Sequence, residues 1–193
     1  PTRWFRPHPG SPAYHLTVSF QPQPGERLYG LGQHPNGRLD QKGCVIDLMQ
    51  RNTEVCIPFL ISNRGYGFLW NNPALGRVEL AENGTRWVAE STRQMDYYIT
   101  AGSTPSQILE RYTAAVGRAP ALPDWAAGFW QSRLRYASQA QVVEIAREYK
   151  RRGLPLDILV IDAGYWLEMG SYTFEPANWP DPQSMVTELE AMG

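Results

Sequence analysis

The sequence predicts an antiparallel β-sandwich followed by the start of a parallel β/α winding. Up to about residue 100, short segments of alternating apolar and polar residues are separated by frequent turn signals, a pattern typical of sandwiches. From Ala126 onward the order changes to strand, helix, strand, helix. The proline-rich stretch RAPALPDW between the two patterns is typical of a semi-rigid linker. We therefore expect a sandwich domain at residues 1–102, a helix and linker at 103–125, and β/α units at 126–193.

The expected sandwich strands come from alternation and from the turns between them. In Tyr14–Phe20 every second side chain is a large apolar or aromatic one. Asn83-Gly84 is a strong hairpin signal, and Pro58 inside a strand indicates a sheet edge or a bulge. Glycines in the segment RLYGLGQHPNGR permit tight backbone bends. The strands expected are Tyr14–Phe20, 54–61, Tyr66–Trp70, 77–80, 85–89 and 94–100.

Caps and periodicity define the helices of the second half. Ser103 or Thr104 caps a first helix that has Pro105 in its opening turn. A strand at 126–133 precedes a helix at 138–152, which carries its apolar residues mainly on one face and ends at Gly153. The last helix starts at Pro182 with Asp181 as its cap.

The segment LPLDILVIDAGYW between the last two helices contains the first candidate site. Its apolar run predicts a strand buried on both faces of a parallel sheet, and that strand ends at Asp162. Because ligands sit at the carboxyl ends of parallel strands, Asp162, Tyr165 and Trp166 are candidate binding residues. A turn or cap role for Asp162, with the aromatic residues serving only for packing, is an equally good interpretation.

Composition excludes some classes of function. A net charge of -1 gives no electrostatic reason to expect nucleic acid or an anionic membrane as a partner, and no apolar run is long enough to span a membrane. The opening PTRWFRPHPG lacks the apolar centre of a signal peptide, which favours a cytoplasmic location. Seven Trp and ten Tyr suit the stacking of sugar rings, although cores and interfaces use the same residues. Since two parallel strands form only a marginal sheet, we expect a longer polypeptide.

Together these motifs resemble glycoside hydrolase family 31, the family of α-glucosidases and α-xylosidases. The stretches that carry the resemblance are ERLYGLGQ, IPFLISNRGYGFLWNN, DYYITAGSTPSQILERYTAAVGRAPALPDWAAGFWQSR, RGLPLDILVIDAGYW and NWPDPQSMVTELEAMG. The resemblance implies a galactose-mutarotase-like sandwich followed by the first two β/α units of a (β/α)8 TIM barrel. It also implies retaining hydrolysis of terminal α-linked xylose or glucose from oligosaccharides, without a metal or cofactor.

The resemblance also implies roles for individual residues. Retaining hydrolysis needs two carboxyl groups about 5 Å apart, and in this family both come from later barrel strands, so no nucleophile or acid/base is assigned before Gly193. Asp162 matches the residue that holds hydroxyls of the sugar in the −1 subsite. Asn52 falls where many relatives bring a loop carboxylate toward the pocket, and Leu134 where they often place a ring. Ala163, with Gly164, replaces bulkier or acidic residues and implies a roomier pocket floor.

The stretch DAGYWLEMGSYTFEPANWPDP is closer to the α-xylosidase branch than to the α-glucosidase branch. A xyloside lacks the C6 hydroxymethyl group, and Trp166 is the side chain that could fill this volume. Glucose stays open, because one hydroxymethyl group changes binding by only about 1–3 kcal/mol. A carbohydrate-binding or scaffold module without hydrolysis is the alternative function, and a homo-oligomer of the full-length protein is a further expectation left open.

Overall fold

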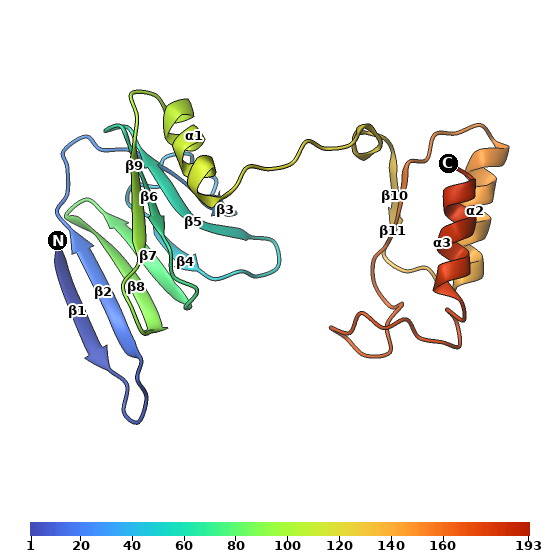
Figure 1. Cartoon of the computed structure of the whole chain (residues 1–193), viewed down its shortest axis with the longest axis horizontal. Helices are drawn as coiled ribbons and strands as arrows, with labels where there is room; N and C mark the ends of the chain where they lie inside the picture. The colour runs from blue at the N-terminus through green and yellow to red at the C-terminus, as the bar shows by residue number, and fades with distance from the viewer. The chain divides into compact units, whose positions relative to one another are not determined.

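Two antiparallel sheets make up the first unit, Pro1–Arg118, of the computed structural model, which describes residues 1–193 (Figure 1). One sheet has the strand order β1-β2-β8-β7-β4 and the other the order β3-β5-β6-β9. The strands are β1 (Thr2–Pro7), β2 (Tyr14–Phe20), β3 (Leu28–Gln33), β4 (Val45–Leu48), β5 (Val55–Ser62), β6 (Tyr66–Trp70), β7 (Gly76–Ala81), β8 (Gly84–Thr92) and β9 (Tyr97–Ala101).

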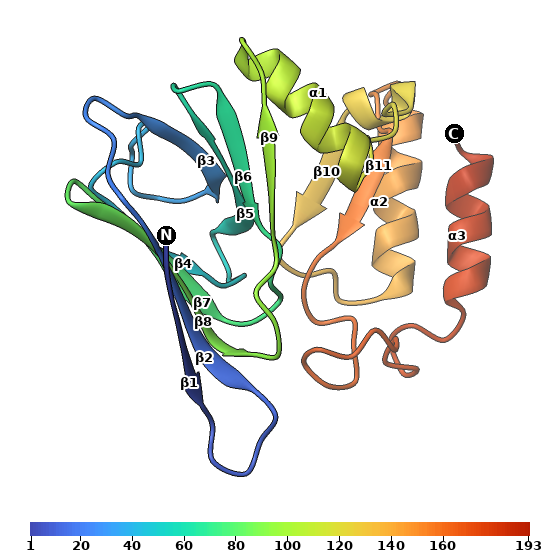
Figure 2. The same cartoon turned by 60° about the vertical axis from the view of Figure 1, so that its left-hand side comes forward.

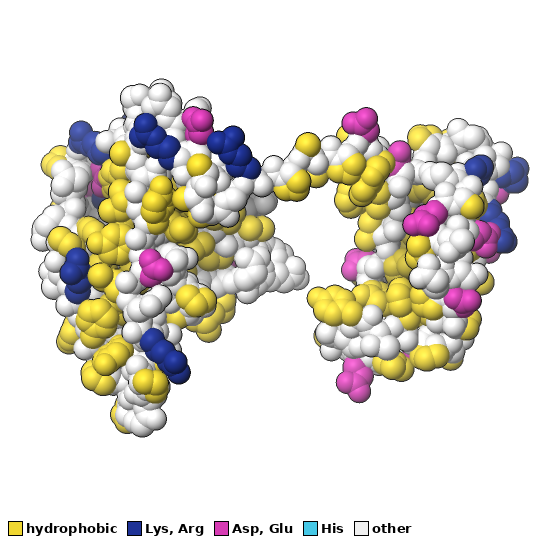
Figure 3. Space-filling view, in the orientation of Figure 1, with side chains coloured by type: hydrophobic (Ala, Val, Ile, Leu, Met, Phe, Trp, Pro, Cys, Tyr) yellow, Lys and Arg dark blue, Asp and Glu magenta, His cyan; other side chains and the backbone are white.

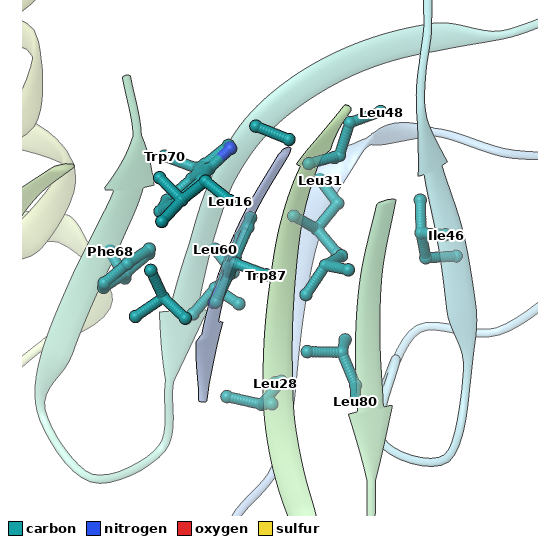
Figure 4. Packing of buried hydrophobic residues seen from close by; sticks show 13 residues of the cluster. Leu16, Leu28, Leu31, Ile46, Leu48, Leu60, Phe68, Trp70, Leu80 and Trp87 are labelled. Atoms are coloured by element: carbon teal, nitrogen blue, oxygen red, sulfur yellow. The ribbon is translucent and has the colours of Figure 1, made fainter. Parts of the chain in front are cut away.

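The core of this unit lies between the two sheets because alternate residues of each strand point inward (Figure 4). Strand β2 contributes Leu16 and Val18, which are fully buried as the alternation predicts. Trp87 of β8 packs on Phe68 of β6 with ring centroids 4.9 Å apart. Because β8 and β6 belong to different sheets, this aromatic contact ties the two layers of the sandwich together.

Helix α1 (Pro105–Val116) packs against the four-stranded sheet of the same unit. Thr104 caps it by accepting a hydrogen bond from the backbone amide of Gln107, and Pro105 opens it, as the sequence predicts. Its buried Ile108 lies over Gly67 of β6, where a Cβ atom would come within 2.7 Å of the Ile108 side chain. The absence of a side chain at residue 67 therefore makes room for the helix.

The second unit, Ala119–Gly193, contains two parallel strands and two helices (Figure 2). Strand β10 (Trp130–Arg133) pairs with β11 (Ile158–Ile161), with Trp130 opposite Ile158 and Arg133 opposite Ile161. Helix α2 (Gln139–Arg151) connects them, and α3 (Pro182–Ala191) follows β11. Ser138 and Asp181 cap these helices through hydrogen bonds from backbone amides, as predicted. A second core forms around Tyr136, Val142, Val143, Trp179 and Met185.

Several local predictions need correction. Strands β1 and β4 were not predicted; β1 is exposed along its length and β4 has only four residues, so neither gives a strong pattern. The glycine-rich segment forms strand β3, which has a register shift between Gly30 and Gly32 where Leu31 takes a φ of 69°. Of the two alternatives predicted from Pro58, the sheet edge is wrong, since β5 lies between β3 and β6, whereas a bulge agrees with the register shift in the part of the β3–β5 ladder where Pro58 lies.

The predicted strand at 126–133 begins only at Trp130, because Asp124–Ala127 form a 3-10 turn. Strand β11 is half-buried rather than buried on both faces, since only β10 pairs with it in this chain. None of the helices combines the length and the apolar character that crossing a membrane requires.

Candidate functional site at the carboxyl ends of β10 and β11

The carboxyl ends of β10 and β11 bring two predicted site residues side by side. Arg133 pairs with Ile161 at the end of the ladder, so Leu134 and Asp162 are the next residues on the two chains. The backbone amide of Ala163 then donates a 3.1 Å hydrogen bond to the carbonyl oxygen of Leu134. This bond continues the contact between the two segments beyond the strands. Leu134, Asp162 and Ala163 therefore share one edge of the parallel sheet.

The carboxylate at this edge faces solvent. Asp162 is exposed and its side chain makes no hydrogen bond or ion pair with the protein. The neighbouring Leu134 side chain is 71% exposed. An exposed carboxylate beside an exposed apolar side chain offers hydrogen-bond acceptors and an apolar surface to a ligand at the same edge.

The two aromatic residues that follow Asp162 have different surroundings. Tyr165 packs on the second core, with its ring centroid 4.9 Å from that of Phe174. Trp166 is half-buried, meets the Tyr165 ring edge-to-face at 5.0 Å, and forms an isolated β-bridge with Phe174. Tyr165 therefore serves the packing role that the sequence left open, and it provides a fixed surface against which Trp166 is held.

Glu175 fastens the far end of the loop that carries Trp166. Its carboxylate accepts hydrogen bonds from the backbone amides of Ala177 and Asn178 at 2.8 and 3.0 Å, and from the Asn178 side chain at 2.9 Å. The bond from the Ala177 amide is the main reason that the pKa of Glu175 lies below its ordinary value. The backbone amide of Glu175 in turn donates a hydrogen bond to the carbonyl oxygen of Tyr165. Glu175 thus has a structural role in this loop.

Two arginines lie at the same edge. The guanidinium of Arg133 lies 5.8 Å from the ring centroid of Tyr136, an intramolecular cation–π contact consistent with a local structural partner. Arg135 lies beside Gly164, which takes a φ of 86°. Sequence reasoning missed Arg135, because nothing in the pattern says which side chain covers the turn after β11.

Asn52 belongs to the sandwich unit and lies at the tip of a tight turn between β4 and β5. Arg51 and Glu54 form an antiparallel bridge on either side of it, and Thr53 takes a φ of 71°. Asn52 is exposed and its side chain makes no hydrogen bond with the protein. Its amide is therefore free to meet a ligand, although a turn role fits the same geometry.

An ion pair holds this turn in place. Arg51 binds the Glu54 carboxylate through two hydrogen bonds of 2.8 and 3.1 Å, and His34 lies 3.7 Å from the same carboxylate. The Arg51 hydrogen bonds lower the pKa of Glu54 and raise the pKa of Arg51. The ion pair stabilises the turn in spite of the unfavourable backbone conformation of Thr53. No group of three or more His, Cys, Asp or Glu side chains is placed to hold a metal ion.

Comparison with known proteins gives matches along almost the whole chain. The model of the glycosyl hydrolase 31 N-terminal galactose mutarotase-like domain matches residues 3–79, and that of the glycosyl hydrolases family 31 TIM-barrel domain matches residues 119–193. Over 191 residues the chain is 48% identical to an uncharacterized family 31 glucosidase of Pseudescherichia vulneris, covering 99% of the chain and 36% of that protein. It is 38% identical to an α-xylosidase of Saccharolobus solfataricus, covering 93% of the chain and 26% of that protein.

Solved structures agree with these sequence matches. A GH31 α-xylosidase from a soil metagenome, complexed with xylose, is 49% identical with a TM-score of 0.89, over 99% of this chain and 28% of that one. A xylosidase from Aspergillus niger is 35% identical with a TM-score of 0.89, and the match covers 98% of this chain and 27% of that one. The predicted fold class, a mutarotase-like sandwich followed by the opening of a TIM barrel, is confirmed. The chain spans about a quarter to a third of the length of these relatives.

Proposed function

Because the chain belongs to glycoside hydrolase family 31, we propose that it forms part of a retaining, exo-acting α-glycoside hydrolase. The substrates are oligosaccharides or other α-glycosides that end in α-linked xylose or glucose. The observation that carries this proposal is the position of Asp162 beside Leu134, at the carboxyl ends of two parallel strands that begin a family 31 barrel. The relatives are about three to four times as long as the chain, so the activity belongs to the whole protein.

Asp162 binds the sugar in the −1 subsite through its hydroxyl groups. Hydroxyl groups that donate to a carboxylate form charge-assisted hydrogen bonds, which are about twice as strong as neutral ones. Such bonds fix the position of the ring, and they accelerate the reaction where they strengthen as the ring flattens toward the transition state. The carboxylate is free for this role because no protein group occupies it.

The remaining residues shape the walls of the subsite. Leu134 supplies an apolar wall at the end of β10, and Ala163 leaves space beside Asp162. Trp166, held against the Tyr165 ring, fills the volume that a C6 hydroxymethyl group would need. Asn52, on its own turn in the sandwich unit, offers an exposed amide to a hydroxyl group of the substrate. The nucleophile and the acid/base are assigned to no residue of this chain.

Xylose is favoured over glucose as the terminal sugar. The similarity to α-xylosidases of Saccharolobus solfataricus and Aspergillus niger, and to a structure that contains xylose, supports this choice. Glucose stays the second candidate, because the relative with 48% identity is named a glucosidase. A pocket wall that excludes one hydroxymethyl group discriminates by about 1–3 kcal/mol, which is 10- to 200-fold in kcat/KM.

Hydrolysis of aryl α-xyloside and aryl α-glucoside tests this proposal. We expect activity from the natural-length product of the gene, with the xyloside preferred and the α-anomer of the sugar released first, as NMR would show. The 193-residue chain alone is expected to be inactive, because no pair of catalytic carboxyl groups is assigned to it. Activity in the short chain would contradict the proposal, and so would inactivity of the natural-length product on both glycosides. If neither the short chain nor the natural-length product hydrolyses either glycoside, a carbohydrate-binding or scaffold module is favoured.

A further inference from the structure

A cavity of about 480 Å³ opens within the sandwich unit, near the ends of β2 and β5 and the starts of β3, β6 and β8. Glu26, Tyr66, Phe20 and Trp87 are among its lining residues. Hydrophobic side chains also reach the surface of this unit on the face shown in Figure 3. The cavity therefore combines an apolar lining with a carboxyl group, which is an unusual pair in a sandwich core.

Glu26 is buried and only half of its carboxylate is satisfied by the protein. The residue is 7% exposed. Its Oε1 atom accepts hydrogen bonds from the Ser62 hydroxyl at 2.6 Å and from the Tyr66 hydroxyl at 2.7 Å, whereas Oε2 accepts none. Burial and the neighbouring Glu26 raise the pKa of Tyr66, so the phenol stays protonated and donates.

The free oxygen of Glu26 keeps access to the cavity. Four fully buried side-chain atoms lack a hydrogen-bond partner in this protein, namely Lys42 Nζ, Trp70 Nε1, Thr100 Oγ1 and Tyr136 Oη, and Glu26 Oε2 is not among them. Oε2 of Glu26 therefore has no hydrogen-bond partner but is still accessible. It is available to a hydrogen-bond donor that enters the cavity.

The aromatic lining is preorganised by contacts among its rings. Phe20 is half-buried and meets Phe68 edge-to-face at 5.4 Å, and Phe68 stacks on Trp87 at 4.9 Å. The buried Phe68 and Trp87 hold the half-buried Phe20 ring in place, so Phe20 loses little side-chain freedom when a ligand packs on it. An apolar ring surface opposite a hydroxyl acceptor is the combination that a sugar requires, since its C–H faces stack while its hydroxyls donate.

We propose that this cavity is a sugar-binding site of the sandwich, in which Glu26 accepts hydrogen bonds from hydroxyl groups of a neutral pyranose. Its lining also contains the uncharged polar residues Gln21, Gln23 and Thr85, which can exchange hydrogen bonds with the hydroxyl groups of a neutral polyol. The site is separate from the turn that carries Asn52. Leu28 pairs with Ser62 at the cavity end of the β3–β5 ladder, whereas Gln33 pairs with Val55 at the end that adjoins the Asn52 turn.

Titration of the chain with methyl α-D-xylopyranoside and methyl α-D-glucopyranoside, followed by NMR chemical shifts and by calorimetry, tests this proposal. We expect saturable binding of at least one glycoside, with shifts at Glu26, Phe20 and the Trp87 indole. Glu26→Gln removes the negative charge and replaces one of the two carboxylate oxygens by an NH2 group, and should weaken binding at least tenfold. Thr85→Tyr puts a larger side chain into the lining and leaves residue 26 itself unchanged, and should weaken binding as much.

Matched variants separate this site from the others. Glu79→Gln, at a half-buried carboxylate on β7 that pairs with Arg77 and Arg86, and Asp162→Ala should both leave this binding unchanged, and circular dichroism should show that every variant is folded. Absence of saturable binding by the folded wild-type chain would overturn the proposal. So would wild-type affinity in both the Glu26 and Thr85 variants, loss of binding in the Asp162 variant alone, or binding of methylguanidinium without binding of either glycoside. None of these outcomes bears on hydrolysis by the natural-length protein.

Discussion

The amide of Ala163, two residues beyond the end of β11, donates a hydrogen bond to the carbonyl oxygen of Leu134, one residue beyond the end of β10. This bond places the side chains of Leu134 and Asp162 at one edge of the sheet although 27 residues lie between them in sequence. Both side chains are exposed there. The proposed sugar subsite therefore begins from a fixed backbone arrangement rather than from two independent loops.

Leu134→Phe in the natural-length protein should strengthen substrate binding. Leu134 is 71% exposed at the strand end, so a ring at this position has room to stack on a sugar without disturbing the core. A stacking contact is worth about 0.5–1.5 kcal/mol, which predicts a KM for aryl α-xyloside lowered about two- to tenfold. Leu122→Phe, in the linker and 82% exposed, is the control. A raised KM, or an equal change in the control, would argue against a pocket wall at residue 134.

Gly67→Ala should destabilise the sandwich unit. A Cβ at residue 67 would lie 2.6 Å from Cζ of Phe59 and 2.7 Å from Cγ2 of Ile108, so the sheet or helix α1 must shift. Overpacking of this kind costs about 1–3 kcal/mol in the free energy of unfolding, which urea titration measures. Ser106→Ala on the exposed face of α1 should leave the stability within about 0.5 kcal/mol of wild type. An unchanged midpoint in the Gly67 variant would mean that the helix is not packed as described.

Thr53→Gly should stabilise the turn that carries Asn52. The φ of 71° at Thr53 is unfavourable for a β-branched residue and natural for glycine. Relief of this strain, less the extra entropy of the unfolded chain, should raise the free energy of unfolding by about 0.5–1 kcal/mol. Thr17→Gly on β2, a strand residue, should lower it instead. A loss of stability in the Thr53 variant would show that the threonine side chain contributes more than its backbone conformation costs.

Glu148 should titrate at unusually low pH. Its carboxylate accepts hydrogen bonds from Arg151 at 2.6 Å and from Arg152 at 2.5 Å, and these lower its pKa to about 2 from an ordinary value of 4.5. Because the folded pKa is the lower one, the contribution of Glu148 to stability is complete above pH 4.5 and is lost as the pH falls toward 2. Carboxyl NMR titration measures this directly. In the Arg151→Ala, Arg152→Ala double variant, the Glu148 carboxyl group should titrate near pH 4.5. If Glu148 titrated near pH 4.5 in the wild-type protein as well, the hydrogen bonds from the two arginines would be contradicted.

Strands and helices that show a clear alternation, turn or capping pattern in their own residues were predicted from the sequence. A strand whose conformation depends on pairing with a neighbouring strand was not. Strand Tyr14–Phe20, the Asn83-Gly84 hairpin and the caps Thr104, Ser138 and Asp181 all have the predicted structure, because alternation and capping are local effects. Strand β1 is exposed and owes its conformation to its pairing with β2. No pattern within its own six residues reveals that pairing.

The site was predictable to the extent that it follows from strand ends. The end of β11 at Ile161 put Asp162 at the sheet edge, and the parallel ladder put Leu134 beside it. The structural roles of Tyr165 and Glu175 depend on Phe174 and on the amides of Ala177 and Asn178, contacts that appear only when the loop is folded. The Glu26 cavity was equally invisible, since it needs residues from several strands.

The most direct test of the central claim is the kcat/KM of the natural-length protein and of its Asp162→Ala variant for aryl α-xyloside. Asp162 is exposed and its side chain makes no hydrogen bond or ion pair within the protein, so the substitution should leave the Tm unchanged. Loss of hydrogen bonds from the sugar hydroxyls to the carboxylate should lower kcat/KM at least tenfold, which corresponds to about 1.4 kcal/mol or more. An unchanged kcat/KM in the folded variant would remove Asp162 from the −1 subsite and contradict the account.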